Sequence, residues 1–261
     1  MIIYGRNAVF EALRGRRAKA VSEIWATAGA AREQWLMQAQ PQIVAAEEIE
    51  RRSGSSSHQG ICADAGGYPY VSAAELLAET QPLIVALDQV QDPQNLGSIC
   101  RTAECVGAAG VVIPERRAAE VTPAVCKASA GAVEHLRLAR VRNMADFLVD
   151  AREAGCWCYG ASGEEDDGEE RARSGAGADT RSGRSARGIV SYDAPDYAGA
   201  GVVLVLGSEG SGLRPRVAKA CDELIALPLL GRIESLGVSA AAAAILYEIL
   251  QARKAGLDNS P

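Results

Sequence analysis

Residues 202–213, VVLVLGSEGSGL, decide the fold, because in this stretch an apolar run leads directly into a glycine-rich turn. A strand followed by such a turn is typical of loops that bind nucleotide phosphates, and Gly207 and Gly212 have the spacing of the two glycines in a P-loop. A P-loop continues with Lys and then Ser or Thr, whereas Leu213 and Arg214 follow here. The pattern is therefore not that of a P-loop.

The residues inside the turn also argue against a phosphate ligand. Its glycines read GxxGxG, in place of the GxGxxG of dinucleotide-binding folds. Glu209 lies within the turn, where its carboxylate would repel a phosphate at close range. A nucleoside ligand without phosphate, or one that carries positive charge, suits this loop better.

The turn belongs to a long stretch in which predicted strands and helices alternate. This alternation predicts an α/β domain with a mostly parallel sheet covered by helices on both faces. Ligands bind such sheets at the carboxyl ends of the strands, which is where LGSEGSGL lies. Strands are predicted near 83–88, 110–114, 136–141, 156–161, 202–206 and 223–228, with helices near 96–106, 122–131, 143–154, 214–221 and 239–254.

The chain divides into three predicted parts. Residues 1–70 form a small α/β domain, residues 71–82 a linker with a short helix, and residues 83–256 the large domain. Within the small domain we predict a helix over residues 31–50 that is broken at Pro41. Residues 163–188 hold six acidic residues followed by five arginines and almost no apolar ones, which predicts a disordered insertion. Its arginines either contact RNA or are simply solvated.

Composition narrows the functional classes. The 261 residues are 48% hydrophobic but only 5% aromatic, so Ala, Val and Leu must fill most of the core. The net charge of −6 argues against a nucleic-acid partner, but arginines cluster locally, for example at Arg116 and Arg117. These clusters are either solvated surface groups or contacts for RNA.

Seven cysteines and an N-terminus without a signal-peptide pattern indicate a reducing compartment. Cys156 and Cys158 would point to one face of a strand, where they are either zinc ligands or, as we expect, buried free thiols. No apolar run reaches the length of a membrane span. We therefore expect a cytoplasmic protein with no membrane contact and no metal.

Two further loops could carry chemistry. The first loop along the chain lies in residues 88–114, DQVQDPQNLGSICRTAECVGAAGVVIP, so the glycine-rich loop at 206–213 is the second loop. A strand ends at Asp88, Pro93 interrupts the chain, and Asn95 is predicted to cap a helix that starts at Leu96. The buried stripe of this helix is predicted to consist of Leu96, Ile99, Cys100 and Ala103.

Arg101 lies off that stripe and has two possible roles. It either pairs on the surface with Glu104 or Glu115, or it is available to a ligand at the end of the sheet.

A third loop, within ALPLLGRIESLGVSAAAAAILYEIL at 226–250, carries Ser235 and leads into an alanine-rich helix. That loop is either an ordinary connection or a further wall of the site.

Together and in this order, the three loops resemble the SpoU/TrmH (SPOUT) family of RNA ribose 2'-O-methyltransferases. The resemblance covers residues 83–254 and rests on DPQNLGSICRTAECVGAAGVVIP, LVLGSEGSGL and LPLLGRIESLGVS. YGRNAVFEAL and HQGICA near the N-terminus are similar to the L30e-like substrate-binding domain of the subgroup that methylates a guanosine in 23S ribosomal RNA. Members that act on tRNA or confer antibiotic resistance share this architecture.

The resemblance implies a fold, a cofactor and an assembly. The C-terminal segment is expected to thread through a loop as a trefoil knot, with S-adenosylmethionine bent between the second and third loops. A homodimer is expected, with residues of both subunits in each site and ribosomal RNA as substrate. The matching cofactor-binding positions are Leu206, Gly207, Ile225, Leu227, Leu236 and Val238.

The resemblance also implies the catalytic groups, which are Asn95, Arg101, Glu209 and Ser235. Arg101 is expected to orient the target phosphate and hydroxyl, Glu209 to hold the loops together, and Ser235 to contact the RNA or Arg101. The third loop departs from the family at Gly237, because SLGVS stands where SLNVS is usual. This departure leaves open a paralogue that binds RNA without methylating it.

Overall fold

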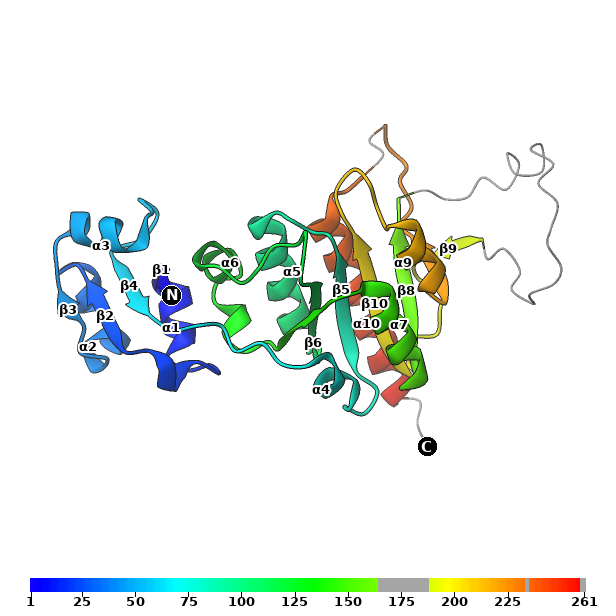
Figure 1. Cartoon of the computed structure of the whole chain (residues 1–261), viewed down its shortest axis with the longest axis horizontal. Coiled ribbons are helices and arrows are strands. Elements are labelled where there is room, and N and C mark those ends of the chain that lie inside the picture. Colours follow the sequence, from blue (N-terminus) through cyan, green and yellow to red (C-terminus); the bar gives the residue numbers. More distant parts are fainter. Residues whose placement is uncertain (164–187, 233–234, 259–261) are drawn as a thin grey trace.

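The computed structural model describes residues 1–163, 188–232 and 235–258. Figure 1 shows a small N-terminal unit beside a larger C-terminal one, joined by an extended linker that runs along both. The predicted disordered insertion at 163–188 lies almost wholly outside the described residues. Among the described helices, none combines the length and apolar character needed to cross a bilayer.

The N-terminal unit is built on a four-stranded mixed sheet in the order β1-β4-β2-β3. Its strands are β1 (Ile2–Tyr4), β2 (Glu23–Ala26), β3 (Gln42–Ile43) and β4 (Ile61–Asp64). Strand β4 pairs antiparallel with β1 and β2, whereas β3 is parallel to β2. Its helices are α1 (Arg6–Ala12), α2 (Gln34–Gln38) and α3 (Ala46–Ser53), with 3₁₀ turns η1 (Ala18–Ala20) and η2 (Ala30–Arg32).

In this unit the predicted break at Pro41 is confirmed, but the predicted extent of the helix over residues 31–50 is wrong. The structure has two short helices there, with the two-residue strand β3 between them. Pro41 ends the helical path, and the next two residues pair with Trp25 and Ala26 of β2. Pairing with a distant strand thus overrides a local helical pattern.

The C-terminal unit contains a seven-stranded sheet in the order β7-β6-β5-β10-β8-β11-β9. All of its neighbouring strands are parallel, which confirms the predicted α/β class. The strands are β5 (Leu83–Asp88), β6 (Gly110–Pro114), β7 (Leu138–Val141), β8 (Cys156–Ser162), β9 (Ile189–Ser191), β10 (Gly201–Gly207) and β11 (Glu223–Ala226).

Helices cover both faces of this sheet, as predicted. Alternate residues of β5 show the division, because Val85 packs in one apolar cluster and Ile84 in another. The first cluster includes residues of α5 (Pro93–Cys105), α6 (Pro123–Ala128), the 3₁₀ turn η3 (Ala132–Glu134) and α10 (Val238–Asp258). The second includes residues of α4 (Ala73–Leu77), α7 (Met144–Glu153) and α9 (Pro215–Ala220).

The linker between the units is fixed to the large sheet where it begins. The backbone N–H of Val71 donates to the carbonyl of Leu138 at 2.9 Å, and Val71 forms a parallel bridge with Ala139 of β7. Helix α4 then buries Leu76 completely against the second face of the sheet. The linker is therefore part of the packed structure.

Candidate active site

The three predicted loops leave the same edge of the large sheet. Strands β5 and β10 are adjacent and parallel, and Gly207 at the end of β10 is in register with Asp88 at the end of β5. Strand β11 ends at Ala226 in the same direction. Because carboxyl ends of parallel strands meet at one edge, residues 88–95, 207–214, 227–232 and 235–237 surround one region.

A charged pair joins the first two loops. The Asp88 side chain is completely buried, and its Oδ1 accepts hydrogen bonds from Arg214 Nε at 2.9 Å and Nη2 at 2.6 Å. Its Oδ2 accepts from the backbone N–H of Arg214 at 3.1 Å. The sequence analysis missed this pair, although an acid at the end of a wholly apolar strand requires a partner on burial.

Helix α5 starts earlier than predicted, and this changes the role of Asn95. The helix begins at Pro93 and is capped by Asp92, whose Oδ1 accepts from the backbone N–H of Gln94 at 2.9 Å. Proline suits the first helical position because it lacks an N–H that would need a partner. The predicted cap at Asn95 is therefore wrong, and the Asn95 side chain lies within the first turn, free to reach another loop.

Asn95 uses that freedom to contact the glycine-rich loop. Its Nδ2 donates a hydrogen bond to Glu209 Oε1 at 2.5 Å, across 114 positions of sequence. Two residues that the sequence assigned to the site are thus in direct contact. The hydrogen bond holds this loop to the start of α5, and the Asp88–Arg214 pair holds it to the end of β5.

The glycine-rich loop folds tightly back on itself. Ser208 and Gly212 exchange both backbone hydrogen bonds, at 3.1 and 3.0 Å. A Cβ built at Gly207 would lie 2.1 Å from the carbonyl carbon of Gly212, so only glycine fits at that position. The loop is a compact backbone structure, and its exposed polar side chains include those of Glu209 and Ser211.

Arg101 is on α5, six residues and about 9 Å beyond Asn95 along the helix axis. Its side chain is exposed, whereas the neighbouring Cys100 is completely buried in the predicted stripe. Neither Glu104 nor Glu115 pairs with it, and no hydrogen bond or ion pair joins it to another described residue. Its guanidinium is available to an anionic partner.

The third loop carries an exposed serine and an unusual backbone turn. Ser235 Oγ accepts a hydrogen bond from the backbone N–H of Gly237 at 3.1 Å. Gly237 has a φ of 77°, in the left-handed region, and its carbonyl accepts from Ala241 in the first turn of α10. No described hydrogen bond joins Ser235 to Arg101 or Glu209, so the structure does not unite all four predicted catalytic groups.

The six predicted cofactor-binding residues differ in exposure. Leu206 and Ile225 are buried in their strands, whereas Leu236 is 53% exposed. Gly207, Leu227 and Val238 are half-buried. These residues provide apolar side chains and close-packed backbone beside the edge of the sheet, which suits an uncharged adenosine better than a polyphosphate.

Cys156 and Cys158 of β8 lie in the core and not at the candidate site. Cys156 and Cys158 are both buried free thiols, and burial raises the pKa of each. Within the described ranges, no three His, Cys, Asp or Glu side chains gather as a metal-binding group.

Comparison with known proteins assigns the two units separately. Residues 82–247 match the SpoU rRNA Methylase family, and residues 2–71 match the family described as RNA 2'-O ribose methyltransferase substrate binding. The first match covers more than half of the chain. Both matches agree with the residues that carry the sequence resemblance.

Individual relatives extend over nearly the whole chain. A putative TrmH family tRNA/rRNA methyltransferase of Bacillus subtilis is 34% identical, covering 96% of this chain and 95% of its own. A 23S rRNA (guanosine-2'-O-)-methyltransferase of Pseudomonas syringae is also 34% identical, with 97% and 96% covered. The AviRb SpoU methyltransferase of Streptomyces viridochromogenes, solved with AdoMet, shares the fold at a TM-score of 0.74, with 21% identity and 98% and 91% covered. The chain belongs to the SpoU family of RNA 2'-O-ribose methyltransferases.

Proposed function

We propose that this protein transfers a methyl group from S-adenosylmethionine to the ribose 2'-hydroxyl of a guanosine in 23S ribosomal RNA. The observation that carries this proposal is the unpaired, exposed Arg101 on the helix whose first turn contacts Glu209. An arginine without a partner among the described residues, on the helix that leaves this edge of the sheet, suits a phosphate of the RNA.

The residues of the second and third loops fit the cofactor. Gly207, Leu227 and Leu236 would hold its adenosine, and Leu206, Ile225 and Val238 would support them. S-adenosylmethionine supplies a methyl group on a positively charged sulfonium and has no phosphate. The exposed carboxylate of Glu209, which argues against a phosphate ligand, does not conflict with such a cation.

In this proposal the polar residues position the reacting groups. Arg101 orients the target phosphate and the 2'-hydroxyl, because a guanidinium keeps its proton in proteins and is a poor general base. Asn95 and Glu209 fix the glycine-rich loop against α5, and Ser235 contacts the RNA or Arg101 from the third loop. Alignment of hydroxyl and methyl donor can supply about 7–11 kcal/mol of the barrier.

The choice of ribosomal RNA is supported by the Pseudomonas syringae relative, whose name specifies a guanosine of 23S rRNA. The equally similar Bacillus subtilis relative is named for tRNA or rRNA, so transfer RNA is the competing substrate. Methylation of matched 23S fragments and tRNA transcripts in vitro separates the two. Mapping 2'-O-methyl groups in cells with and without the gene identifies the nucleotide, and methylation of tRNA alone would contradict the proposal.

Cofactor binding is a separate test. Calorimetry should detect stoichiometric binding of S-adenosylmethionine, and an absence of binding at millimolar concentration would contradict the proposal.

We also propose a cytoplasmic homodimer with a trefoil knot formed by the second and third loops. The exposed Leu230 of the third loop, 99% accessible, is a side chain that a second subunit would cover. Light scattering should give twice the mass of the chain.

A second candidate is an RNA-binding paralogue without methyl transfer, which is favoured by Gly237. Among the described residues, no heavy atom lies within 4 Å of a Cβ built at Gly237. The space that the family's usual amide side chain would occupy is therefore open to that extent. Retention of ribosomal RNA together with absent methyl transfer, in the presence of bound cofactor, would favour this candidate. Turnover by the natural chain would exclude it.

A further inference from the structure

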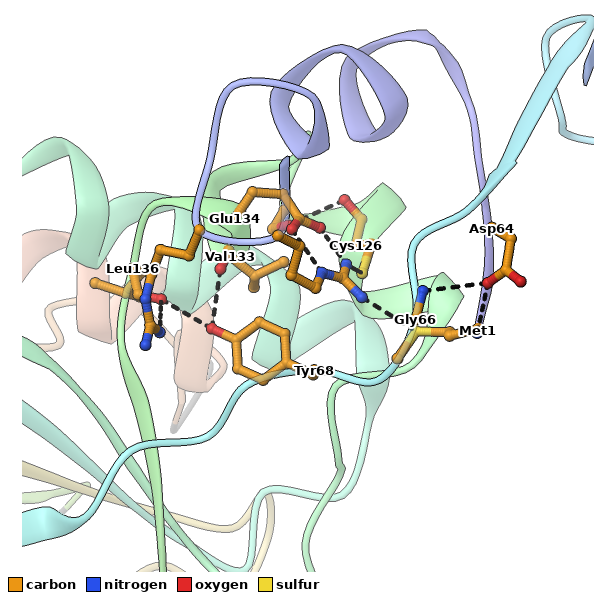
Figure 2. Close-up of polar contacts among 11 residues, drawn as sticks. Met1, Asp64, Gly66, Tyr68, Cys126, Val133, Glu134 and Leu136 are labelled. Carbon is orange, nitrogen blue, oxygen red and sulfur yellow. Dashed lines mark hydrogen bonds and ion pairs between the residues drawn. The ribbon is translucent and has the colours of Figure 1, made fainter. Parts of the chain in front are cut away.

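The two units meet at a buried charged pair that the chemistry above does not use. Arg17, at the N-terminal end of η1, extends its side chain to Glu134 of η3. Figure 2 shows Glu134 with Cys126 and Tyr68 close by. The two side chains are 1% and 0% exposed. Arg17 Nε donates to Glu134 Oε2 at 2.8 Å, and its Nη2 donates to Oε1, so the contact is bidentate.

The surroundings of the guanidinium complete the cluster. Arg17 Nη2 also donates to Cys126 Sγ at 3.4 Å, and the guanidinium carbon lies 5.5 Å from the centre of the Tyr68 ring. Burial raises the pKa of Cys126 to about 12, so this sulfur is a neutral thiol that accepts the bond. Burial alone would lower the pKa of Arg17, but its hydrogen bond with Glu134 raises it.

The segment that leads from β4 into the linker is fixed to the same place. The Tyr68 hydroxyl lies 2.9 Å from the carbonyl oxygen of Val133 and 2.8 Å from that of Leu136, on either side of Glu134. Because the hydroxyl has one proton, it donates to one carbonyl at a time. The backbone N–H of Arg16 donates to the carbonyl of Glu134 at 2.8 Å. Directional bonds thus reach this one turn from two separate segments of the N-terminal unit, residues 16–17 and Tyr68.

Apolar contact alone would also hold the units together. Ile3 and Val9 of the N-terminal unit share a buried cluster with Cys126 and Val133 of the C-terminal unit. Apolar burial has no preferred direction, whereas a bidentate ion pair fixes angle and distance. Burying such a pair adds little net stability over apolar residues, but it can specify one arrangement. Its role at this interface is therefore orientation.

The element that carries Glu134 packs against the helix that carries the candidate site residues. Glu134 lies on η3 after α6, and both elements pack against α5, the helix that carries Asn95 and Arg101. The approach of α6 to α5 is close, because a Cβ built at Gly97 would lie 2.5 Å from the Cβ of Ala128. An altered position of Arg17 would change where the N-terminal unit lies relative to Arg101.

We propose that Arg17 and Glu134 are positioning residues, which hold the RNA-binding unit at one fixed angle to the methylase unit. RNA bound by the first unit then presents a single ribose to Arg101. The inference rests on the proposed function for its substrate, a folded RNA that spans both units, but the fixed angle itself can be measured without activity.

The test uses the full chain with the double change Arg17→Met and Glu134→Leu, which replaces the pair by apolar side chains. The variant should bind S-adenosylmethionine within about twofold of the natural chain, since the edge of the sheet is untouched. Its kcat/KM for RNA should fall about a hundredfold, the cost expected from misplacing the reacting groups by about 1 Å. Small-angle X-ray scattering should show a broader distribution of interatomic distances.

Two further variants keep the test decisive. Arg17→Lys keeps the charge but loses the bidentate geometry, so it should give an intermediate loss even where the double variant does not fold. Glu11→Gln, which weakens the exposed contact of Glu11 with His135 at the same interface, is the matched control and should leave kcat/KM unchanged. A folded double variant with natural scattering and natural kcat/KM would overturn the inference. If the natural chain transfers no methyl group, the proposed function fails, and scattering still tests the fixed angle.

Discussion

Arg17 and Arg101 carry the same guanidinium in opposite surroundings. Arg17 is 2% exposed, and its nitrogens are directed at Glu134, Cys126 and Met1. Arg101 is exposed and has no partner among the described residues. A buried guanidinium needs every partner that the protein can provide, whereas an exposed one keeps its hydrogen-bonding capacity for a ligand. The contrast separates a residue that holds the molecule together from one that is available for chemistry.

Arg214 lies between these extremes. Its partner Asp88 is completely buried, but the Arg214 side chain is 44% exposed. Such a pair anchors a loop while one end remains in contact with water. The three arginines therefore differ in burial: Arg17 and its partner are both buried, Arg214 is partly exposed against a buried partner, and Arg101 is exposed.

The largest effect should come from breaking the buried pair on one side only. Arg17→Met leaves the Glu134 carboxylate buried without its partner, so the free energy of unfolding should fall by about 3–5 kcal/mol. Urea unfolding measures this loss, and the double variant with Glu134→Leu should recover most of it. A single variant as stable as the natural chain would show that the pair is not desolvated as the structure indicates.

Removing the exposed arginine should affect turnover and not stability. Arg101→Ala should lower the rate of methyl transfer about 100- to 1,000-fold, because a charge-stabilising contact to the RNA is lost. Single-turnover assays measure the rate, and calorimetry should show unchanged affinity for S-adenosylmethionine. Arg216→Ala is the matched control, since Arg216 is 76% exposed and pairs with Asp146. Equal rates for Arg101→Ala and the natural chain would remove Arg101 from the mechanism.

Helix α5 shows which features of the fold could be predicted from the sequence. The buried stripe of α5 was predicted correctly, because helical periodicity is a local signal, and the parallel sheet followed from alternating strands and helices. The cap of that helix was not, since Asp92 and Asn95 are both good capping residues and only the path of the chain selects Asp92.

Long-range polar contacts were beyond the sequence pattern. Arg17 and Glu134 are 117 positions apart, and Arg214 and Asp88 are 126 apart, so no local spacing relates them. Asn95 and Glu209, which form a hydrogen bond, are likewise 114 positions apart. The resemblance assigns both residues to the site, but it does not indicate that they touch. Resemblance identified candidate groups, and the fold determined which of them touch.

A smaller effect tests that contact between loops. Asn95→Ala and Glu209→Ala should each weaken binding of S-adenosylmethionine about two- to tenfold, the range expected for one hydrogen bond. Because both changes break the same bond, the affinity of the double variant for S-adenosylmethionine should be close to that of the single variant with the lower affinity. Calorimetry of the four proteins measures the coupling. Fully additive losses would indicate that the two side chains act independently.

The smallest effect concerns Gly237. Asparagine tolerates the left-handed conformation better than other residues with a Cβ, and the site is open, so Gly237→Asn should change the free energy of unfolding by less than about 1 kcal/mol. Gly237→Ala is the control and should cost more, about 1–2 kcal/mol. Thermal unfolding gives both values. An asparagine variant as destabilised as the alanine variant would contradict this account of the turn.

The position of the transferred methyl group tests the central claim most directly. The protein is incubated with S-adenosylmethionine labelled in its methyl group and with 23S ribosomal RNA transcribed in vitro, and the RNA is then digested to nucleosides and analysed by mass spectrometry. The account predicts that the label appears in 2'-O-methylguanosine. Label in a base-methylated nucleoside, or no label in RNA while the cofactor is bound, would contradict it.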